Sequence, residues 1–335
     1  GAVATSTSYG AFQNQTSLIS ITFASSDTLV SIGDSSFKGC TYLSSMTLPT
    51  STTVVYNNAF ENCTNLRNIG LTNVTYIGSS AFKNAMVNGA DVSIDLSSAT
   101  YIGDNAFESS TSLTNVDLSK NTALTYIGKS AFTGSLISGS STTTIDLSKA
   151  AALKTISDGA FAGCTNLTSV VLPSAGVLTT IGANAFKGAT SLTQVGSTAN
   201  TFTAPSSLGN YVLTTVTGGT DYVSSGIGTH AFDGTKITTI DLSSLTATTP
   251  FTNATFKNMT SLATVNFGSS SKITTIPYSL FENDTALTTL TLPSSITSIA
   301  SGANNTNSDT NTYVDQKSPF YNSGLVTICL LYTSD

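Results

Sequence analysis

The sequence predicts a β-rich repeat solenoid, in which one chain winds into a stack of similar coils. The first observation is the segment Leu153–Pro173, with the pattern L-x-x-I-x-x-x-A-F-x-G-C-x-x-L-x-x-V-x-L-P. The second is that its phenylalanine returns along nearly the whole chain, mostly in steps of 22 to 25 residues. A period of this length is typical of arrays in which each copy is one supersecondary unit. The recurring residues are Phe12, Phe37, Phe60, Phe82, Phe107, Phe132, Phe161, Phe186, Phe232, Phe256, Phe281 and Phe320.

The number of coils depends on one irregular gap. A globular chain of 335 residues would divide into two domains, but a solenoid coil needs only its neighbours to bury its apolar face. Phe186 and Phe232 are 46 residues apart, which is about twice the period. We therefore expect a degenerate coil near 200–217, with Leu208 at the phenylalanine position and a strand over 213–216. This gives thirteen coils.

The stretch 300–318 and the two ends of the sequence differ from the repeats. The solenoid is expected to cover 1–328 as a single domain. The Asn/Ser/Thr-rich stretch 300–318 delays the next phenylalanine and predicts one protruding loop. Residues 329–335, CLLYTSD, match the translation of a sequencing adapter, so we expect a frame assembled from shotgun reads whose native part stops near 328. The chain has no initiator Met and begins within the pattern, as expected of a fragment or mature segment.

Each repeat predicts a strand in its second half and a return turn in its first half. In L-x-x-V-x-L, apolar and polar residues alternate, which is the period of a half-buried strand. Ile-Gly, as at Ile181 and Gly182, predicts a short strand followed by a bend. The following A-F-x-G/N predicts one helical or 3₁₀ turn, closed by Gly or Asn in the left-handed conformation. The phenylalanines should then stack in a single column.

Three segments carry a resemblance to a known family: IGDSSFKGCTYLSSMTLP (32–49), ISDGAFAGCTNLTSVVLP (156–173) and IGANAFKGATSLTQV (181–195). With the order and spacing kept over 7–328, the chain resembles the BspA-like, or Treponema-type, leucine-rich repeat. The resemblance implies a right-handed solenoid with a parallel sheet on one face. It also implies a cell-surface or secreted protein of bacteria or parasitic protists, used for adhesion or protein binding, without catalytic residues. The chain departs from the family in its many Ser and Thr residues and in its frequent loss of the motif cysteine.

Composition argues against two classes of partner. Only 9% of the residues are charged, the net charge is −6 and the isoelectric point is about 4.6. Such a chain has no basic surface for phosphates, so we expect no nucleic-acid binding. There is no apolar run of about 18 residues, so we expect no membrane-spanning helix in this segment.

The cysteines and the single histidine do not indicate an enzyme. Cys40, Cys63 and Cys164 each stand three residues after a motif phenylalanine, where other copies have Ala, Ser or Thr. This pattern predicts a small, semi-buried packing position, although a Cys40–Cys63 disulfide between adjacent coils is geometrically conceivable. With no C-x-x-C spacing and only His230, in a turn, neither a zinc site nor a catalytic triad is available. We expect no cofactor.

The candidate binding residues are those that point outward from the predicted strands. Asp95, Asp117 and Asp146 fall on consecutive coils, about 4.8 Å apart if the strands stack. Stacked carboxylates repel, which raises the pKa of at least one of them unless a cation or water relieves the repulsion. One interpretation is a cation site or an acidic patch for a basic partner. The other is a turn device, because each of these residues precedes Leu-Ser, and an Asp there can accept backbone N–H bonds.

Threonines form the rest of the candidate surface, at Thr144, Thr215, Thr217 and Thr239. Ranks of Thr-x-Thr on a flat solenoid sheet raise ice binding as a remote alternative, although aspartates interrupt these ranks. The outward residues of the predicted strands include no aromatic anchor, so binding there is expected to be weak per site and to gain from multivalency.

These observations favour a non-catalytic cell-surface or secreted protein that mediates adhesion. The expected partners are surface or matrix proteins, or glycans, of a host or neighbouring cell. The alternative is a structural spacer whose coils hold another domain away from the cell. The invariant residues build the coil, so recognition is expected in the residues that vary between copies.

Overall fold

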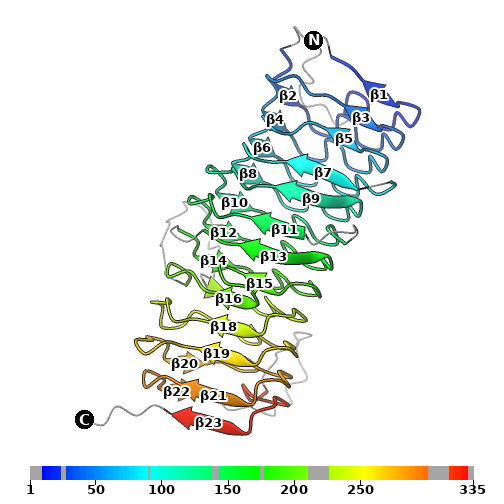
Figure 1. Cartoon of the computed structure of the whole chain (residues 1–335). Coiled ribbons are helices and arrows are strands. Elements are labelled where there is room, and N and C mark those ends of the chain that lie inside the picture. The colour runs from blue at the N-terminus through cyan, green and yellow to red at the C-terminus, as the bar shows by residue number, and fades with distance from the viewer. Residues whose placement is uncertain are drawn as a thin grey trace, which may run out of the picture.

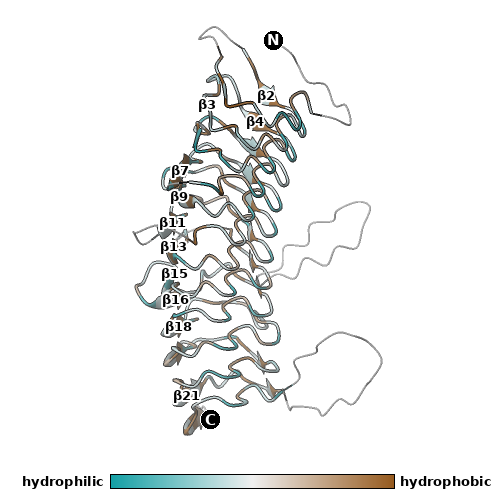
Figure 2. Cartoon of the chain, turned by 90° about the vertical axis from the view of Figure 1, so that its right-hand side faces the viewer, coloured by the Kyte–Doolittle hydropathy of each residue, from teal (hydrophilic) through white to brown (hydrophobic). Residues whose placement is uncertain are grey.

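The computed structural model forms one elongated stack of coils, in which every paired strand runs parallel to its neighbours (Figure 1). The chain winds so that strands of consecutive coils lie side by side in two columns on different sides of the stack (Figure 2). The predicted β-solenoid is thereby confirmed. The structure describes residues 10–23, 28–89, 91–137, 143–173, 177–209, 226–300 and 317–330.

The first column, called here the long-strand face, is built from the L-x-x-V-x-L half of the repeats. Its strands pair in a common register, so that Ser20, Ser45 and Asn68 lie next to one another. Its members are β1 (Ser20–Ile21), β3 (Ser45–Met46), β5 (Asn68–Ile69), β7 (Val92–Asp95), β9 (Leu113–Asp117), β11 (Thr143–Asp146), β13 (Leu167–Val171), β15 (Gln194–Val195), β16 (Thr201–Thr203), β18 (Thr239–Asp241), β19 (Thr264–Asn266), β21 (Thr289–Leu292) and β23 (Thr327–Leu330).

The second column, the short-strand face, comes from the residues around Ile-Gly. Each strand has two residues. In several coils the residue after the strand is a glycine that lies against the backbone of the preceding coil. A Cβ added to Gly103, for example, would lie 2.7 Å from the carbonyl carbon of Gly78. The members are β2 (Ser31–Ile32), β4 (Val54–Val55), β6 (Tyr76–Ile77), β8 (Tyr101–Ile102), β10 (Tyr126–Ile127), β12 (Thr155–Ile156), β14 (Thr180–Ile181), β17 (Gly226–Ile227), β20 (Thr275–Ile276) and β22 (Ser298–Ile299).

The turn that carries the motif phenylalanine is not helical, and this part of the prediction is wrong. None of the described residues lies in a helix. In the coil of Phe161, the residues two before and two after it, Gly159 and Gly163, have φ of 63° and 68°. Left-handed residues at these positions divide the segment into successive β-turns, and they free the N–H groups of residues 159, 161 and 163 to donate to the next coil. The left-handed Gly or Asn two residues after Phe is as predicted; the one before it was not foreseen.

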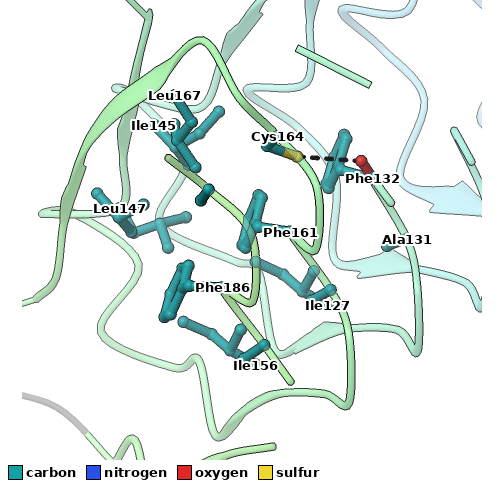
Figure 3. Close-up of a cluster of buried hydrophobic side chains, with 14 of the residues drawn as sticks. Ile127, Ala131, Phe132, Ile145, Leu147, Ile156, Phe161, Cys164, Leu167 and Phe186 are labelled. Carbon is teal, nitrogen blue, oxygen red and sulfur yellow. Dashed lines mark hydrogen bonds between the residues drawn. The ribbon is translucent and has the colours of Figure 1, made fainter. Parts of the chain in front are cut away.

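The phenylalanines stack as predicted. Neighbouring rings in the column from Phe12 to Phe320 have centroids 5.1 to 6.1 Å apart. Figure 3 shows Phe132, Phe161 and Phe186 among the leucines and isoleucines of both strand columns. Burial of one such side chain stabilises the fold by about 1.5–3 kcal/mol. The stack is therefore held by the residues that do not vary between copies.

The prediction of thirteen coils is slightly too high, because the solenoid has about ten turns. Within the described ranges, the short-strand column contains ten strands. The turn of Phe186 hydrogen-bonds directly to that of Phe232, with ring centroids 5.5 Å apart, so no coil separates them there. Leu208 is buried but does not enter the phenylalanine column. Among the described residues of the gap, β16 is the additional strand, and it enters the long-strand face between β15 and β18. The predicted strand at 213–216 lies outside the described residues.

Two predictions about the C-terminal part remain predictions. Most of the proposed loop at 300–318 lies outside the described residues. The segment 329–335 is described only as far as Leu330, in β23, so its proposed adapter origin is untested.

Candidate functional site

The long-strand face presents small polar side chains to solvent. In β21, Thr289 and Thr291 are exposed and Leu290 and Leu292 are buried, which confirms the predicted alternation. The same pattern holds in β7 and β11, where the central isoleucine is buried and the residue before it is exposed. The outward residues of successive coils therefore form two columns along the stack.

The three aspartates lie in one of these columns. Asp95 and Asp117 are partners in the β7–β9 register, and Asp146 is paired with Val171. Each carboxylate accepts the backbone N–H of the serine two residues later, and Asp241 does the same. The Oδ1···N distances are 2.8 Å for Ser97, 3.0 Å for Ser119, 2.9 Å for Ser148 and 3.1 Å for Ser243. This is the geometry of the turn device.

At Asp117 the pKa shift is opposite to the rise that was expected for at least one of the three aspartates. The Ser119 hydroxyl donates to its Oδ1 at 2.7 Å, and this bond, with the Ser119 N–H, lowers the pKa of Asp117 despite partial burial. Hydrogen bonds that favour the charged form outweigh desolvation here. Within the described ranges, no group of three or more His, Cys, Asp or Glu side chains is arranged to hold a metal ion. Binding at Asp95, Asp117 and Asp146 stays a prediction.

The structure describes two of the four predicted threonines. Thr144 is exposed and Thr239 is half-buried, both on the predicted face. Thr215 and Thr217 lie outside the described residues. The place assigned to them in the strand column is taken by β16: its Thr201 pairs with Thr239, and its Thr203 pairs with Asp241. Sequence spacing alone could not show that this coil is shortened immediately after β15.

The cysteine position is a buried packing slot, as predicted. Cys40, Cys63 and Cys164 are free thiols. Each S–H donates to the carbonyl of the phenylalanine in the preceding coil, at 3.0, 3.0 and 3.1 Å; Figure 3 draws the bond from Cys164 to Phe132. Ser110 makes the same contact at 2.8 Å. Burial raises the pKa of the Cys164 thiol, so it stays protonated at neutral pH. A protonated thiol can donate a hydrogen bond but is a poor nucleophile.

A column of alternating charges follows the phenylalanines. The residue after the motif Phe forms ion pairs between neighbouring coils, from Lys38 to Glu61 at 2.7 Å and from Lys83 to Glu108 at 2.8 Å. Half-exposed pairs of this kind contribute little stability singly. They do favour the pairing of each coil with its direct neighbour, because pairing with the coil after that would place Lys38 opposite Lys83. The alternation is visible in the sequence, although we did not predict it.

His230 has a local role in one turn. Its φ of 56° places it at the left-handed position two residues before Phe232, and its Nδ1 lies 3.2 Å from a carboxylate oxygen of Asp233. Burial of Asp233 opposes ionisation, but hydrogen bonds from His230 and Asn258 outweigh it and lower the pKa of Asp233. The histidine therefore supports the turn, as expected for a lone surface histidine.

The short-strand face carries an aromatic ladder that the sequence analysis missed. Tyr76, Tyr101 and Tyr126 are in register, with ring centroids 5.1 and 5.0 Å apart and planes within 6° and 14° of parallel. Tyr56 lies beside the row but outside its register, because Tyr76 pairs with Val54; its ring is tilted by 55° and its centroid is 6.3 Å from that of Tyr76. Burial raises the pKa of Tyr101 and Tyr126, so both hydroxyls stay protonated at neutral pH. The signal was present as TYIG, repeated at 75–78, 100–103 and 125–128.

The comparison with protein families identifies the repeat. A family model described as "BspA type Leucine rich repeat region (6 copies)" matches residues 4–95, 88–212 and 209–311. The chain belongs to this family. The resemblance seen in the sequence motifs is thus confirmed, and the variable outward residues are placed on a leucine-rich-repeat scaffold. No curated protein matches the sequence.

Several solved structures are similar in fold. A leucine-rich repeat protein from Bacteroides ovatus is 19% identical, with 86% of this chain and 82% of that one covered and a TM-score of 0.30. The Treponema pallidum leucine-rich repeat protein is 24% identical over 55% and 71%, with a TM-score of 0.36. A leucine-rich cell surface protein from Faecalibacterium prausnitzii is 21% identical over 78% and 84%, with a TM-score of 0.28. Similarity at these levels does not indicate what this chain binds.

Proposed function

We propose that this chain is a non-catalytic adhesive protein, displayed on the cell surface or secreted, which binds protein partners through the long-strand face. Surface display is what membership of this repeat family implies. Among the residues that the structure describes, no helix is long and apolar enough to cross a membrane.

The observation that supports binding is the contrast between the fixed core and the variable face. The phenylalanines from Phe60 to Phe281 are fully buried, so they are unavailable to a partner. The outward residues vary from coil to coil between Ser, Thr, Asn and Asp, while their spacing is fixed by the strand register. Solenoids use such extended, regularly spaced surfaces for recognition.

The chemistry of this face favours many weak contacts. Its side chains are short, and the Asp carboxylates are held through Oδ1 by the serine N–H groups. The Oδ2 of Asp95 also accepts a hydrogen bond from Thr72 at 3.3 Å. A short, pre-positioned acceptor loses little side-chain entropy on binding. Repetition along the stack can then raise the avidity for a partner that is itself repetitive.

The experiment compares two triple variants with equal changes in charge. The first, D95N/D117N/D146N, alters the long-strand face and retains the Oδ1 acceptors of its turns. The second, D34N/D104N/D158N, alters three aspartates that accept backbone N–H bonds on the other column. The corresponding bonds are Asn57 to Asp34 at 2.9 Å, Lys129 to Asp104 at 2.8 Å and Ala183 to Asp158 at 2.9 Å.

Purified chain is applied to immobilised laminin, collagen and fibronectin, and binding is measured by surface plasmon resonance. We expect binding of the wild type to at least one matrix protein, weakened by about tenfold in the first variant and unchanged in the second. No binding above that of a charge-matched control protein would refute adhesion to these matrix proteins and would favour the spacer alternative. Equal loss in both variants would refute the assignment to the long-strand face.

A further inference from the structure

The tyrosine ladder of the short-strand face is a second surface feature, distinct from the surface proposed for adhesion. It consists of Tyr76, Tyr101 and Tyr126, whose rings are half-buried at the surface. Tyr56, which is 42% exposed, lies beside Tyr76 but outside the register. A tyrosine recurs here although threonine fits the same register position, as at Thr155 and in two other strands. Packing of the coil therefore does not require the aromatic ring.

The ring geometry leaves aromatic surface available. Atoms in van der Waals contact lie about 3.5–4.0 Å apart. The ring centroids of Tyr76, Tyr101 and Tyr126 are 5.1 and 5.0 Å apart with nearly parallel planes. Adjacent rings are therefore offset, and each leaves a strip of its face uncovered by its neighbour. The row ends at Tyr126, because the next residue in register, Thr155, is too small to cover a phenol ring.

The polar groups around the end of the ladder are balanced in charge. The Tyr126 hydroxyl donates to Oδ1 of Asp104 at 3.2 Å. Asp158, Lys129 and Lys154 are exposed on the adjoining residues. Two carboxylates and two ammonium groups cancel, so the surroundings favour neither an anionic nor a cationic ligand. They supply both acceptors and donors, as a ligand rich in hydroxyl groups requires.

We propose that the tyrosine ladder binds a neutral, extended polysaccharide built of equatorially linked pyranose rings. The axial C–H groups of such a sugar form a flat apolar face that packs on an aromatic ring, while its equatorial hydroxyls reach the flanking Asp and Lys side chains. Successive sugars along an extended chain repeat at about the spacing of the coils. A chain parallel to the stack can therefore contact one tyrosine per sugar. This inference goes beyond the proposed function, because it uses the other column and another class of ligand.

The binding test uses cellohexaose and chitohexaose as probes, in isothermal titration calorimetry. The variant is Y76T/Y101T/Y126T, which introduces the residue that β12, β14 and β20 carry at this position. The matched control is Y42T, since Tyr42 is 64% exposed and lies outside the ladder. Circular dichroism melting checks that both variants fold. We expect the wild type to bind at least one hexamer, the triple variant to bind it about tenfold or more weakly, and Y42T to bind as the wild type.

Three outcomes would overturn the inference. The first is no binding of either hexamer by the wild type. The second is equal affinity of the wild type and a folded triple variant. The third is competition by the monosaccharide as strong as by the hexamer, which would exclude an extended chain. The long-strand variant D95N/D117N/D146N should leave hexamer binding unchanged. Failure of glycan binding and failure of matrix-protein binding are thereby separated.

Discussion

Replacing Asp284 with asparagine tests whether this carboxyl group is protonated in the folded protein. Asp284 occupies the packing slot that Cys40, Cys63 and Cys164 fill in other coils, and it is fully buried. Its Oδ1 accepts the N–H of Met259 at 2.8 Å, whereas its Oδ2 has no hydrogen-bond partner within the described part of the chain. The three cysteines donate to the preceding coil from this slot. We expect a protonated Asp284 to do the same from Oδ2.

The direction of the pH dependence follows from the surroundings of this residue. Burial raises the pKa of Asp284 well above its usual value; the Met259 N–H opposes the shift, and the charge of Asp233 adds to it. The neighbouring Glu282 is ionised and held by Lys257 and Lys317, at 3.2 and 2.8 Å. Folding therefore binds a proton at Asp284. Its contribution to stability is complete below the unfolded pKa of about 3.9 and is lost as the pH rises through the folded value.

The magnitude is set by the cost of a buried polar group without a partner, about 1–3 kcal/mol. Asparagine retains the Oδ1 acceptor for Met259 and supplies an N–H donor at every pH. We expect D284N to be more stable than the wild type by that amount at pH 8. The difference should be small at about pH 4, where the wild-type carboxyl is protonated.

Because a solenoid opens locally, the assay is hydrogen exchange of peptides from 254–292, measured by mass spectrometry. Wild type and variant are compared at the same pH, so intrinsic exchange rates cancel. D241N, which changes an aspartate at a strand exit, controls for the change in net charge. The argument is refuted if D284N protects these peptides equally at both pH values, or exposes them at pH 8.

Two further predictions concern the core. Phe161→Ala removes one ring of the phenylalanine column and should cost about 3–5 kcal/mol in urea unfolding, whereas Y42T should change stability by less than about 0.5 kcal/mol; similar effects of the two would contradict the column as the main source of stability. Cys40, Cys63 and Cys164 should react with a thiol reagent only after denaturation, because they are buried and their S–H groups are hydrogen-bonded. Rapid modification of the native protein, or a Cys40–Cys63 disulfide on a non-reducing gel, would show that the slot is open.

The sequence was sufficient for the features that every coil repeats. The spacing around Phe161 predicted the ring column, the alternating strand and a left-handed residue at Gly163. It also gave two interpretations for Asp117, of which the structure shows the hydrogen bonds of the turn device. Local periodicity carries this information because each coil contacts only its neighbours.

Other features were missed because they depend on particular coils. The turn before Phe161 was predicted as helical, since A-F-x-G resembles a helical end, but its hydrogen bonds go to the next coil. The tyrosines of the ladder were not predicted to interact. Tyr126 stands before the repeated Ile-Gly, at a position where another coil has Thr155, so the position looked variable. Whether these tyrosines contact one another depends on which coils stack side by side.

The sequence by itself determined the solenoid, its core and the identity of its outward residues. A coil with a repeated pattern of apolar side chains can bury them only by stacking on similar coils. Only the tertiary structure decided the register of the irregular coil. There, β16 lies between β15 and β18, with Thr201 paired to Thr239, because a short connection after β15 returns the chain directly to the sheet. The stacking of coils also decided that the tyrosines form a ladder and that Asp284 is buried in the packing slot. Both features result from contacts between residues of different coils.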